Sequence, residues 1–199
     1  PVSAQDITDV ADITHAITLL LQDKTATVLV EAEKLPNREG ITCRTVNEQF
    51  DDFVVSLFGE MVARNNTYKD TGSDPAALEG FEERVYVLYG VKKLFDRLSE
   101  DGKDKLAVLL EKAESIYKLH FILVDSVAQM SAFSYDAWFK RQIPGGDGLW
   151  IGDGVTEQYL MKISKITSDL YAEVGSGYGY LVAKNRPVLV KLLTAKKEE

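Results

Sequence analysis

The sequence predicts an α/β domain with a central, mainly parallel β-sheet and helices on both faces. Short runs of β-branched and aliphatic residues alternate along the chain with longer segments whose apolar residues recur every three or four positions. Continuous apolar strands are typical of a sheet that is buried on both faces. Strands that alternate with helices are joined by crossovers that keep them parallel.

The first half of the chain supplies a helix, two strands and a long second helix. Apolar residues have helical spacing over 10–21, and the strand-type run TATVLVEA follows at 25–32. After the loop LPNREG, a short strand, ITCRTV, is expected at 41–46. Asn47 is a suitable N-cap for a helix that ends near Tyr68. Its predicted inner face comprises Phe50, Phe53, Val54, Leu57, Met61 and Val62.

The middle of the chain supplies the strand RVYVLY at 84–89, which we expect at the centre of the sheet. A helix follows it directly from Val91, and another is expected from about Lys103 to Leu119. FILV at 121–124 is the next buried strand.

The last third predicts a short aromatic helix over 135–143 and the strand GLWI at 148–151. GYGYLVA and PVLVKLL then predict a hairpin that turns at Lys184, Asn185 and Arg186. We expect this hairpin at one edge of the central sheet.

The composition favours one globular domain over residues 1–199 and excludes several classes of protein. Thirty-one acidic against 23 basic residues give a formal charge of −8, which argues against a nucleic-acid-binding surface. No apolar stretch is long enough to span a bilayer, and the single Cys43 cannot form an internal disulfide. The start PVSAQDITDVAD lacks the order of a signal peptide and predicts a fragment of a longer chain.

Three glycine clusters invite a phosphate-binding interpretation, namely PGGDG, GDG and GSGYG at 144–148, 152–154 and 175–179. A phosphate cradle needs its glycines after a strand and before a helix, with a GK[ST] sequence. GDG is the nearest candidate, before an expected helix at Thr156, but turn glycines are the better interpretation. Before the strand at 25–32, the first Lys is Lys24 and the first Gly of the chain is Gly40, so this sequence contains no P-loop there.

Residues suited to catalysis are few. The strand at 84–89 ends in Tyr89-Gly90, where many nucleotide-hydrolysing folds place carboxylates that hold Mg²⁺. Asp125 is the one carboxylate predicted at a strand tip, where it is either a functional group or, like Ser126, a helix N-cap. His15 and His120 are expected to be structural, and no ligand spacing predicts a metal site.

The order of elements resembles that of the last ATPase domain of FtsK/SpoIIIE-type motors, most closely the membrane-bound ATPase of Gram-positive type VII secretion, the EssC type. The segments concerned are VLVEAEKLP, NEQFDDFVVSLFGEMVARNNTYK, VYVLYGVKKLFDRLSED, HFILVDS and the ending GLWIGDGVTEQYLMKIS…GYGYLVAKNRPVLVKLL. The resemblance covers nearly the whole chain. It implies a RecA-like, three-layer fold in a cytoplasmic domain of a cell-membrane protein.

The same resemblance implies that this copy has lost its catalytic parts. Tyr89-Gly90 lies at the Walker B position, and PVSAQDITDVAD lies where the P-loop would be. ATP binding is therefore doubtful, and no cofactor is expected. The implied partners are secreted WXG100-type substrates or their chaperones and the other ATPase domains of the same chain. Two alternatives stay open: an active ATPase domain whose P-loop lies upstream, and a structural module that assembles the ring.

An aromatic cluster, FSYDAWF at 133–139 followed by Trp150, is either core or a groove for a partner's amphipathic helix. Signals of this secretion class are expected to be helices with an aromatic and an acidic residue, which need an apolar groove beside a cation. The predicted partner-binding residues are Tyr135, Trp138, Phe139, Lys140, Arg141 and Trp150.

Overall fold

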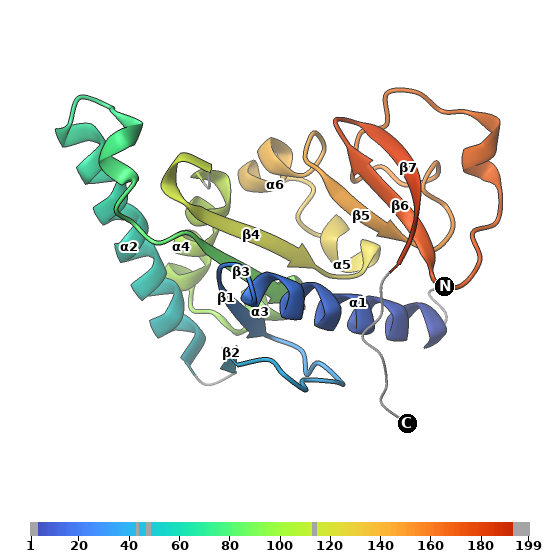
Figure 1. Cartoon of the computed structure of the whole chain (residues 1–199), viewed down its shortest axis with the longest axis horizontal. Helices are drawn as coiled ribbons and strands as arrows, with labels where there is room; N and C mark the ends of the chain where they lie inside the picture. Colours follow the sequence, from blue (N-terminus) through green and yellow to red (C-terminus); the bar gives the residue numbers. More distant parts are fainter. Residues whose placement is uncertain (1–3, 43, 47–48, 113–114, 193–199) are drawn as a thin grey trace.

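Four parallel strands form the central sheet of the computed structural model, which describes residues 4–42, 44–46, 49–112 and 115–192 (Figure 1). In their order across the sheet, the strands are β2 (Arg44–Val46), β1 (Ala26–Glu31), β3 (Arg84–Tyr89) and β4 (Leu119–Val124). Both pairs that β3 makes are parallel and extend over its whole length. The predicted sheet and the inner position of the 84–89 strand are confirmed.

Helices cover both faces of this sheet, as predicted. On one face, α1 (Ala4–Gln22) packs against side chains that alternate along the strands, such as Leu29 and Val87. On the other face, α2 (Phe50–Asp70), α3 (Val91–Arg97) and α4 (Glu100–Lys112) pack against the intervening residues, such as Val30 and Leu88. Because successive side chains of a strand point to opposite faces, apolar strands such as β1 and β3 join two cores.

Several helices differ from their predicted bounds, and two of these differences concern the end of α4 and the start of α2. The helix expected over 103–119 ends at Lys112, and after a 3₁₀ turn at Ser115–Tyr117 the chain enters β4 at Leu119. Lys118 has a φ of 54°, a left-handed conformation that a helix cannot continue through. The predicted N-cap Asn47 lies outside the described residues, and the structure places the N-cap of α2 at Gln49.

The inner face of α2 is largely as predicted. Phe50, Val54, Leu57 and Met61 are buried, and Phe53 is half-buried. Val62 is exposed, since it lies one position past Met61 and points away from the core.

The predicted C-terminal hairpin is present, but it does not join the central sheet. Its strands β6 (Tyr178–Ala183) and β7 (Arg186–Lys191) form a separate antiparallel sheet with β5 (Gly148–Ile151), in the order β5-β6-β7. The reason is that β5 pairs with β6 along its whole length, so the hairpin buries Tyr180 and Val182 in a small core of its own.

The hairpin turns through a two-residue loop, Lys184-Asn185, in which both residues have left-handed backbone conformations. Lys184 and Asn185 both have positive φ, at 51° and 62°, and they join the paired residues Ala183 and Arg186. Two left-handed residues in succession match the twist of the flanking strands. Asn tolerates this conformation better than most residues.

Short elements complete the chain between and around the sheets. They are the 3₁₀ turns at Pro75–Leu78 and Ser168–Tyr171 and the helices α5 (Val127–Ser131) and α6 (Ala137–Gln142). The helix expected at Thr156 is absent, and the structure has turns there. No helix among the described residues is long and apolar enough to cross a membrane.

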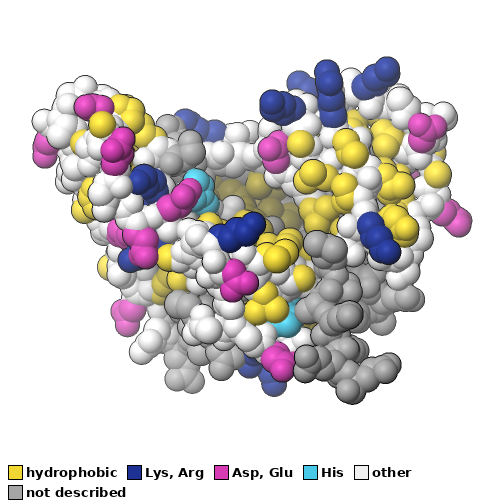
Figure 2. All heavy atoms as spheres, viewed as in Figure 1, with side chains coloured by type: hydrophobic (Ala, Val, Ile, Leu, Met, Phe, Trp, Pro, Cys, Tyr) yellow, Lys and Arg dark blue, Asp and Glu magenta, His cyan; other side chains and the backbone are white. Residues whose placement is uncertain are grey.

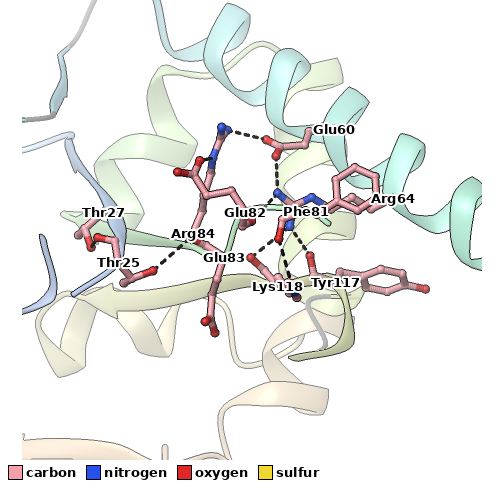
Figure 3. A network of polar contacts seen from close by, with 10 residues as sticks. All are labelled: Thr25, Thr27, Glu60, Arg64, Phe81, Glu82, Glu83, Arg84, Tyr117 and Lys118. Atoms are coloured by element: carbon pink, nitrogen blue, oxygen red, sulfur yellow. Dashed lines mark hydrogen bonds and ion pairs between the residues drawn. The ribbon is translucent and has the colours of Figure 1, made fainter. Parts of the chain in front are cut away.

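A buried arginine joins α2 to the chain segments that lead into β3 and β4 (Figure 3). Arg64 is 1% exposed, and its Nη1 donates to the carbonyl of Tyr117 at 2.6 Å. Its Nη2 donates to the carbonyl of Glu82 at 2.9 Å and forms an ion pair with Glu60 at 2.6 Å. The guanidinium also lies over the ring of Phe81. One side chain therefore holds the starts of two central strands against α2.

Replacement of this arginine tests its role in stability. Arg64→Ala leaves the carbonyls of Tyr117 and Glu82 without their buried donor, so we expect a loss of about 3 kcal/mol in the free energy of unfolding. Urea denaturation measures the change. Lys69→Ala, at an exposed position of the same helix, is the control and should change stability by less than about 0.5 kcal/mol. Equal stability of the two variants would contradict this role.

Candidate functional site

The carboxyl ends of β1, β3 and β4 meet at one edge of the central sheet. Glu31, Tyr89 and Val124 are paired in register as the last residues of these three strands. Parallel α/β folds place their ligands outside this edge, so it is the first place to look for a site. The residues that follow the strands decide what the edge can do.

Gly90 makes the turn from β3 into α3, and no other residue fits there without rearrangement. Its φ is 84°, and a Cβ atom at this position would lie 2.5 Å from Cγ of Glu33. The backbone at the tip is closely packed, because the amides of Ala32 and Glu33 both donate to the carbonyl of Tyr89, at 3.0 and 3.2 Å. The Tyr89-Gly90 tip therefore serves close packing between two strand ends, and it has no carboxylate.

Asp125, the predicted strand-tip acid, is engaged as a cap for α3. Gly90 is the N-cap residue of α3 and has no side chain to offer. The amide of Lys92 instead donates to Oδ2 of Asp125 at 2.8 Å, and the amide of Ser126 donates to Oδ1 at 2.7 Å. Both carboxylate oxygens are thus occupied by backbone donors. Of the two predicted roles, capping is present. The helix that Asp125 caps is α3, which follows the neighbouring strand β3, and not the helix that follows Asp125 in the chain. Ser126 caps α5 separately, accepting from the amide of Gln129.

The environment of Asp125 also disfavours its charge. Burial raises the pKa of this carboxyl, while the two backbone N–H groups act in the opposite direction. Burial likewise raises the pKa of the Tyr89 hydroxyl, and the nearby carboxylates of Glu33 and Asp125 add to this effect.

Three cations at this edge are already paired with acids. Arg38 donates to the buried Glu31 at 2.7 Å, and Lys93 lies 2.5 Å from Glu33. Lys92 forms an ion pair with Asp96 on α3. A phosphate group would have to displace these carboxylates before it could bind the same cations. In the described part of the chain, no group of three or more His, Cys, Asp or Glu side chains could hold a metal ion.

The two histidines have structural contacts, as predicted. His15 is buried, with Nε2 2.7 Å from the carbonyl of Glu39 and Nδ1 3.3 Å from Asn37. His120 lies 2.8 Å from the carboxylate of Glu83 and is more accessible than the strand pattern predicts.

The predicted aromatic surface is divided between core and solvent. Trp138 and Phe139 belong to the main core, where Trp138 is 1% exposed and stacks on Phe95. The prediction that these two residues contact a partner is therefore wrong in this structure: a helix of this length presents one face, and α6 turns that face inward. Tyr135 is 85% exposed, with Lys140 above its ring.

The other two residues of the predicted surface, Arg141 and Trp150, do not form a groove with Tyr135. Arg141 is exposed beside Glu111. Trp150 is half-buried on β5 and packs against the small core of the second sheet. Its indole N–H donates to the carbonyl of Asp153 at 2.9 Å.

Sequence reasoning missed the part played by Glu31 and Glu33, the acids at the end of β1. Glu31 is buried and accepts from the amide of Leu35 as well as from Arg38, and Glu33 closes over Gly90. The signal was the run VEAEK, in which two acids follow an apolar strand. It was overlooked because acidic residues near strand ends are most often solvated.

The strand tip can be tested by adding one methyl group. Gly90→Ala should destabilise the fold by at least about 2 kcal/mol, because the residue would be strained at positive φ and would collide with Glu33. Gly59→Ala is the matched control, since a Cβ there meets nothing within 4 Å and lies in α2. That control should stabilise the fold by about 0.5 kcal/mol in urea denaturation. Destabilisation of both variants to a similar degree would contradict the argument.

The pH dependence of stability tests the environment of Asp125. Because burial raises its folded-state pKa above the unfolded value, its contribution is full below that unfolded pKa and is lost as the pH rises through the folded pKa. The stability of the wild type relative to Asp125→Asn should therefore fall as the pH is raised from about 4 to 7. Urea denaturation at several pH values measures this difference, with Asp23→Asn as the control. A difference that grows with pH would contradict it.

No family model matches the sequence, and no curated protein matches it. Among solved structures, the chain is similar to the cytoplasmic domain of EssC, with a TM-score of 0.67 and 14% identity over 94% of this chain and 38% of that one. It is also similar to Thermomonospora curvata EccC (ATPases 2 and 3) in complex with a signal sequence peptide, with a TM-score of 0.64 and 16% identity over 94% of this chain and 35% of that one.

EssC (ATPases 2 and 3) from Geobacillus thermodenitrificans gives a TM-score of 0.64 at 14% identity, again over 94% of this chain and 35% of the other. The chain thus spans little more than a third of these neighbours. Likeness at such low identity concerns the fold, and it confirms the three-layer arrangement predicted from the sequence. The chain has the fold of the ATPase domains of EssC and EccC.

Proposed function

We propose that this chain is a non-hydrolysing, substrate-recognition domain of a type VII secretion motor ATPase. In this proposal it acts on the cytoplasmic side of the cell membrane, as one of several ATPase domains of a longer chain. Its partners are WXG100-type substrates or their chaperones, together with the other ATPase domains. The membrane is reached only through the full-length protein.

The state of the strand edge is the observation on which the proposal depends. At the position of a Walker B carboxylate the chain has Tyr89-Gly90, and the acid on the neighbouring strand, Asp125, accepts two backbone hydrogen bonds. A hydrolytic site needs carboxylates that are free to hold Mg²⁺ and a group that positions water. The cations Lys92 and Lys93 are paired with acids, which further disfavours a triphosphate.

The fold neighbours supply the support for substrate recognition. One of them, EccC from Thermomonospora curvata, is in complex with a signal sequence peptide. A domain that keeps this fold without its catalytic groups can still present a docking surface to such a segment. The accessible part of the predicted surface, Tyr135 with Lys140 and Arg141, is one place for that contact.

Measurement of ATP turnover tests the non-hydrolytic part of the proposal. The purified chain with Mg²⁺ and ATP should release phosphate no faster than the buffer does, because Tyr89-Gly90 offers the metal no carboxylate. Asp125→Ala should show the same background rate. The proposal fails if the wild type turns ATP over in a Mg²⁺-dependent way and Asp125→Ala abolishes that turnover.

A further inference from the structure

The second sheet buries one of its faces and leaves much of the other uncovered. The buried face packs under the loop between β5 and β6, in a cluster formed by Trp150, Tyr180 and Val182 with Val155, Met161, Ile163, Leu170 and Val174. Side chains at alternate positions point the opposite way. They form an apolar surface, and no cluster of buried side chains among the described residues packs against it.

The opposite face has an apolar row across all three strands, half-buried at its β5 end and exposed on β6 and β7. Leu149, Leu181 and Val188 are direct cross-strand neighbours, and Leu181 and Val188 are 44% and 57% exposed. Val190 lies on the same side of β7, as does Arg186 at the other end of that strand. We call these five residues the hairpin face.

Exposed apolar side chains are concentrated in this part of the molecule. Of the twelve large hydrophobic side chains that are exposed in the described residues, seven lie between residues 159 and 189. Figure 2 shows hydrophobic side chains gathered on the part of the molecule that contains the second sheet, beside a hollow that separates it from the part containing α2. Such a concentration on a soluble domain marks an interaction surface.

The charge of this region is opposite to that of the rest of the chain. Residues 148–192 contain five Lys and Arg against four Asp and Glu, within a chain of net charge −8. Within the described part of the chain, none of the five cations, Lys162, Lys165, Lys184, Arg186 and Lys191, forms an ion pair. Most cations around the central sheet are paired, so the unpaired ones mark where an acidic partner would gain most.

A hollow joins the cations to apolar surface at the edge of the second sheet. It has a volume of about 410 Å³ and lies between the loop after β5 and the start of β7. Lys165 and Arg186 line it together with Ser164, Thr167, Leu170 and Pro187. The two cations and two hydroxyls suit an acidic residue at the outer edge of β7, while Leu170 and Pro187 belong to the covered side of the sheet.

We propose that the hairpin face docks an acidic, amphipathic helix of a secreted substrate. This inference rests on the proposed function and gives it a location. The apolar side of the helix lies across Leu149, Leu181 and Val188. Its acidic residues lie toward Arg186 and Lys165.

The geometry favours a docked helix over an added strand. Three neighbouring strands span about 10 Å from the first to the third, which is about the diameter of an α-helix. One of the two edge strands of this sheet is β7, where Pro187 has no N–H to donate and Lys191 adds a charge. Proline and lysine on an edge strand disfavour pairing with another strand. The side chains, rather than the backbone edge, are therefore the accessible feature.

Binding of labelled peptides to surface variants tests this location. Fluorescein-labelled C-terminal segments of WXG100-type proteins from the source organism are titrated with the wild-type chain, and fluorescence anisotropy gives the affinity. Leu181→Thr with Val188→Thr should weaken binding at least about tenfold, since both side chains lie at the centre of the hairpin face. Both positions are exposed, so circular dichroism and thermal unfolding should show an intact fold.

A charge reversal and its matched control test the acidic character of the partner. Lys165→Glu with Arg186→Glu should weaken binding at least about tenfold at low salt, and the effect should shrink as salt is added. Lys24→Glu with Lys69→Glu makes the same change in net charge at exposed positions of other elements. These controls should change the affinity by less than about twofold, because neither site lies on the second sheet or lines the hollow beside it.

The outcomes separate this inference from the proposed function. If no segment binds the wild type, the proposed function fails and the inference fails with it. If segments bind and the threonine variant binds them equally well, the inference alone is overturned. Loss of binding in Tyr135→Ala, with the hairpin-face variants unaffected, would place the signal beside α6 and overturn it in the same way.

Discussion

The hydrogen bonds from Lys92 and Ser126 to the carboxylate of Asp125 determine what the functional edge of this fold can do. A helix that begins at a glycine has no side-chain cap of its own, and the donors of its first turn need an acceptor. The neighbouring strand supplies that acceptor across the sheet edge. The same arrangement fixes the start of α3 relative to β4 and engages both carboxylate oxygens of Asp125 in backbone hydrogen bonds.

Gly90 and Asp125 together explain why this edge is compact. The glycine allows β3 to turn against Glu33, and the paired acids and cations around it neutralise one another. In a nucleotide-hydrolysing domain the corresponding groups stay available for phosphate and Mg²⁺. Here the carboxylate of Asp125 and the cations Arg38, Lys92 and Lys93 have partners within the protein. In our proposal the partner surface lies instead on the second sheet, where the described residues include exposed apolar side chains and cations without ion pairs.

The central sheet could be predicted from sequence because its strands have strong local signals. RVYVLY and FILV are apolar on both sides, which is typical of a doubly covered sheet. The inner strand β3 buries both sets of its side chains, and those of FILV on the edge strand β4 are half-buried. The 3₁₀ turn and the left-handed Lys118 before β4 could not be predicted, since the carbonyl of Tyr117 in this segment accepts a hydrogen bond from Arg64 of another helix. The pairing of the C-terminal hairpin with β5 could not be predicted either, because pairing between strands far apart in the sequence leaves no local pattern in either strand.

The residues at the strand tips could be predicted from the sequence, but the exposure of the aromatic side chains could not. The absence of an acid at Tyr89-Gly90 and the strand-tip position of Asp125 follow from the order of residues alone. Burial of Trp138 and Phe139 depends on how α6 rotates against Phe95 and Phe133, which the spacing of four aromatics in seven residues does not determine. The exposed rows of the hairpin face likewise appear only once the register of three strands is known.

The central claim is that the edge formed by β1, β3 and β4 no longer receives a nucleotide. It is tested most directly by recording ¹⁵N–¹H spectra of the labelled chain during a titration with Mg²⁺ and a non-hydrolysable ATP analogue. The account predicts that the amide signals of Gly90, Lys92 and Ser126 stay unchanged, because their donors and the adjoining cations are already engaged. Saturable shifts of those three signals would contradict it.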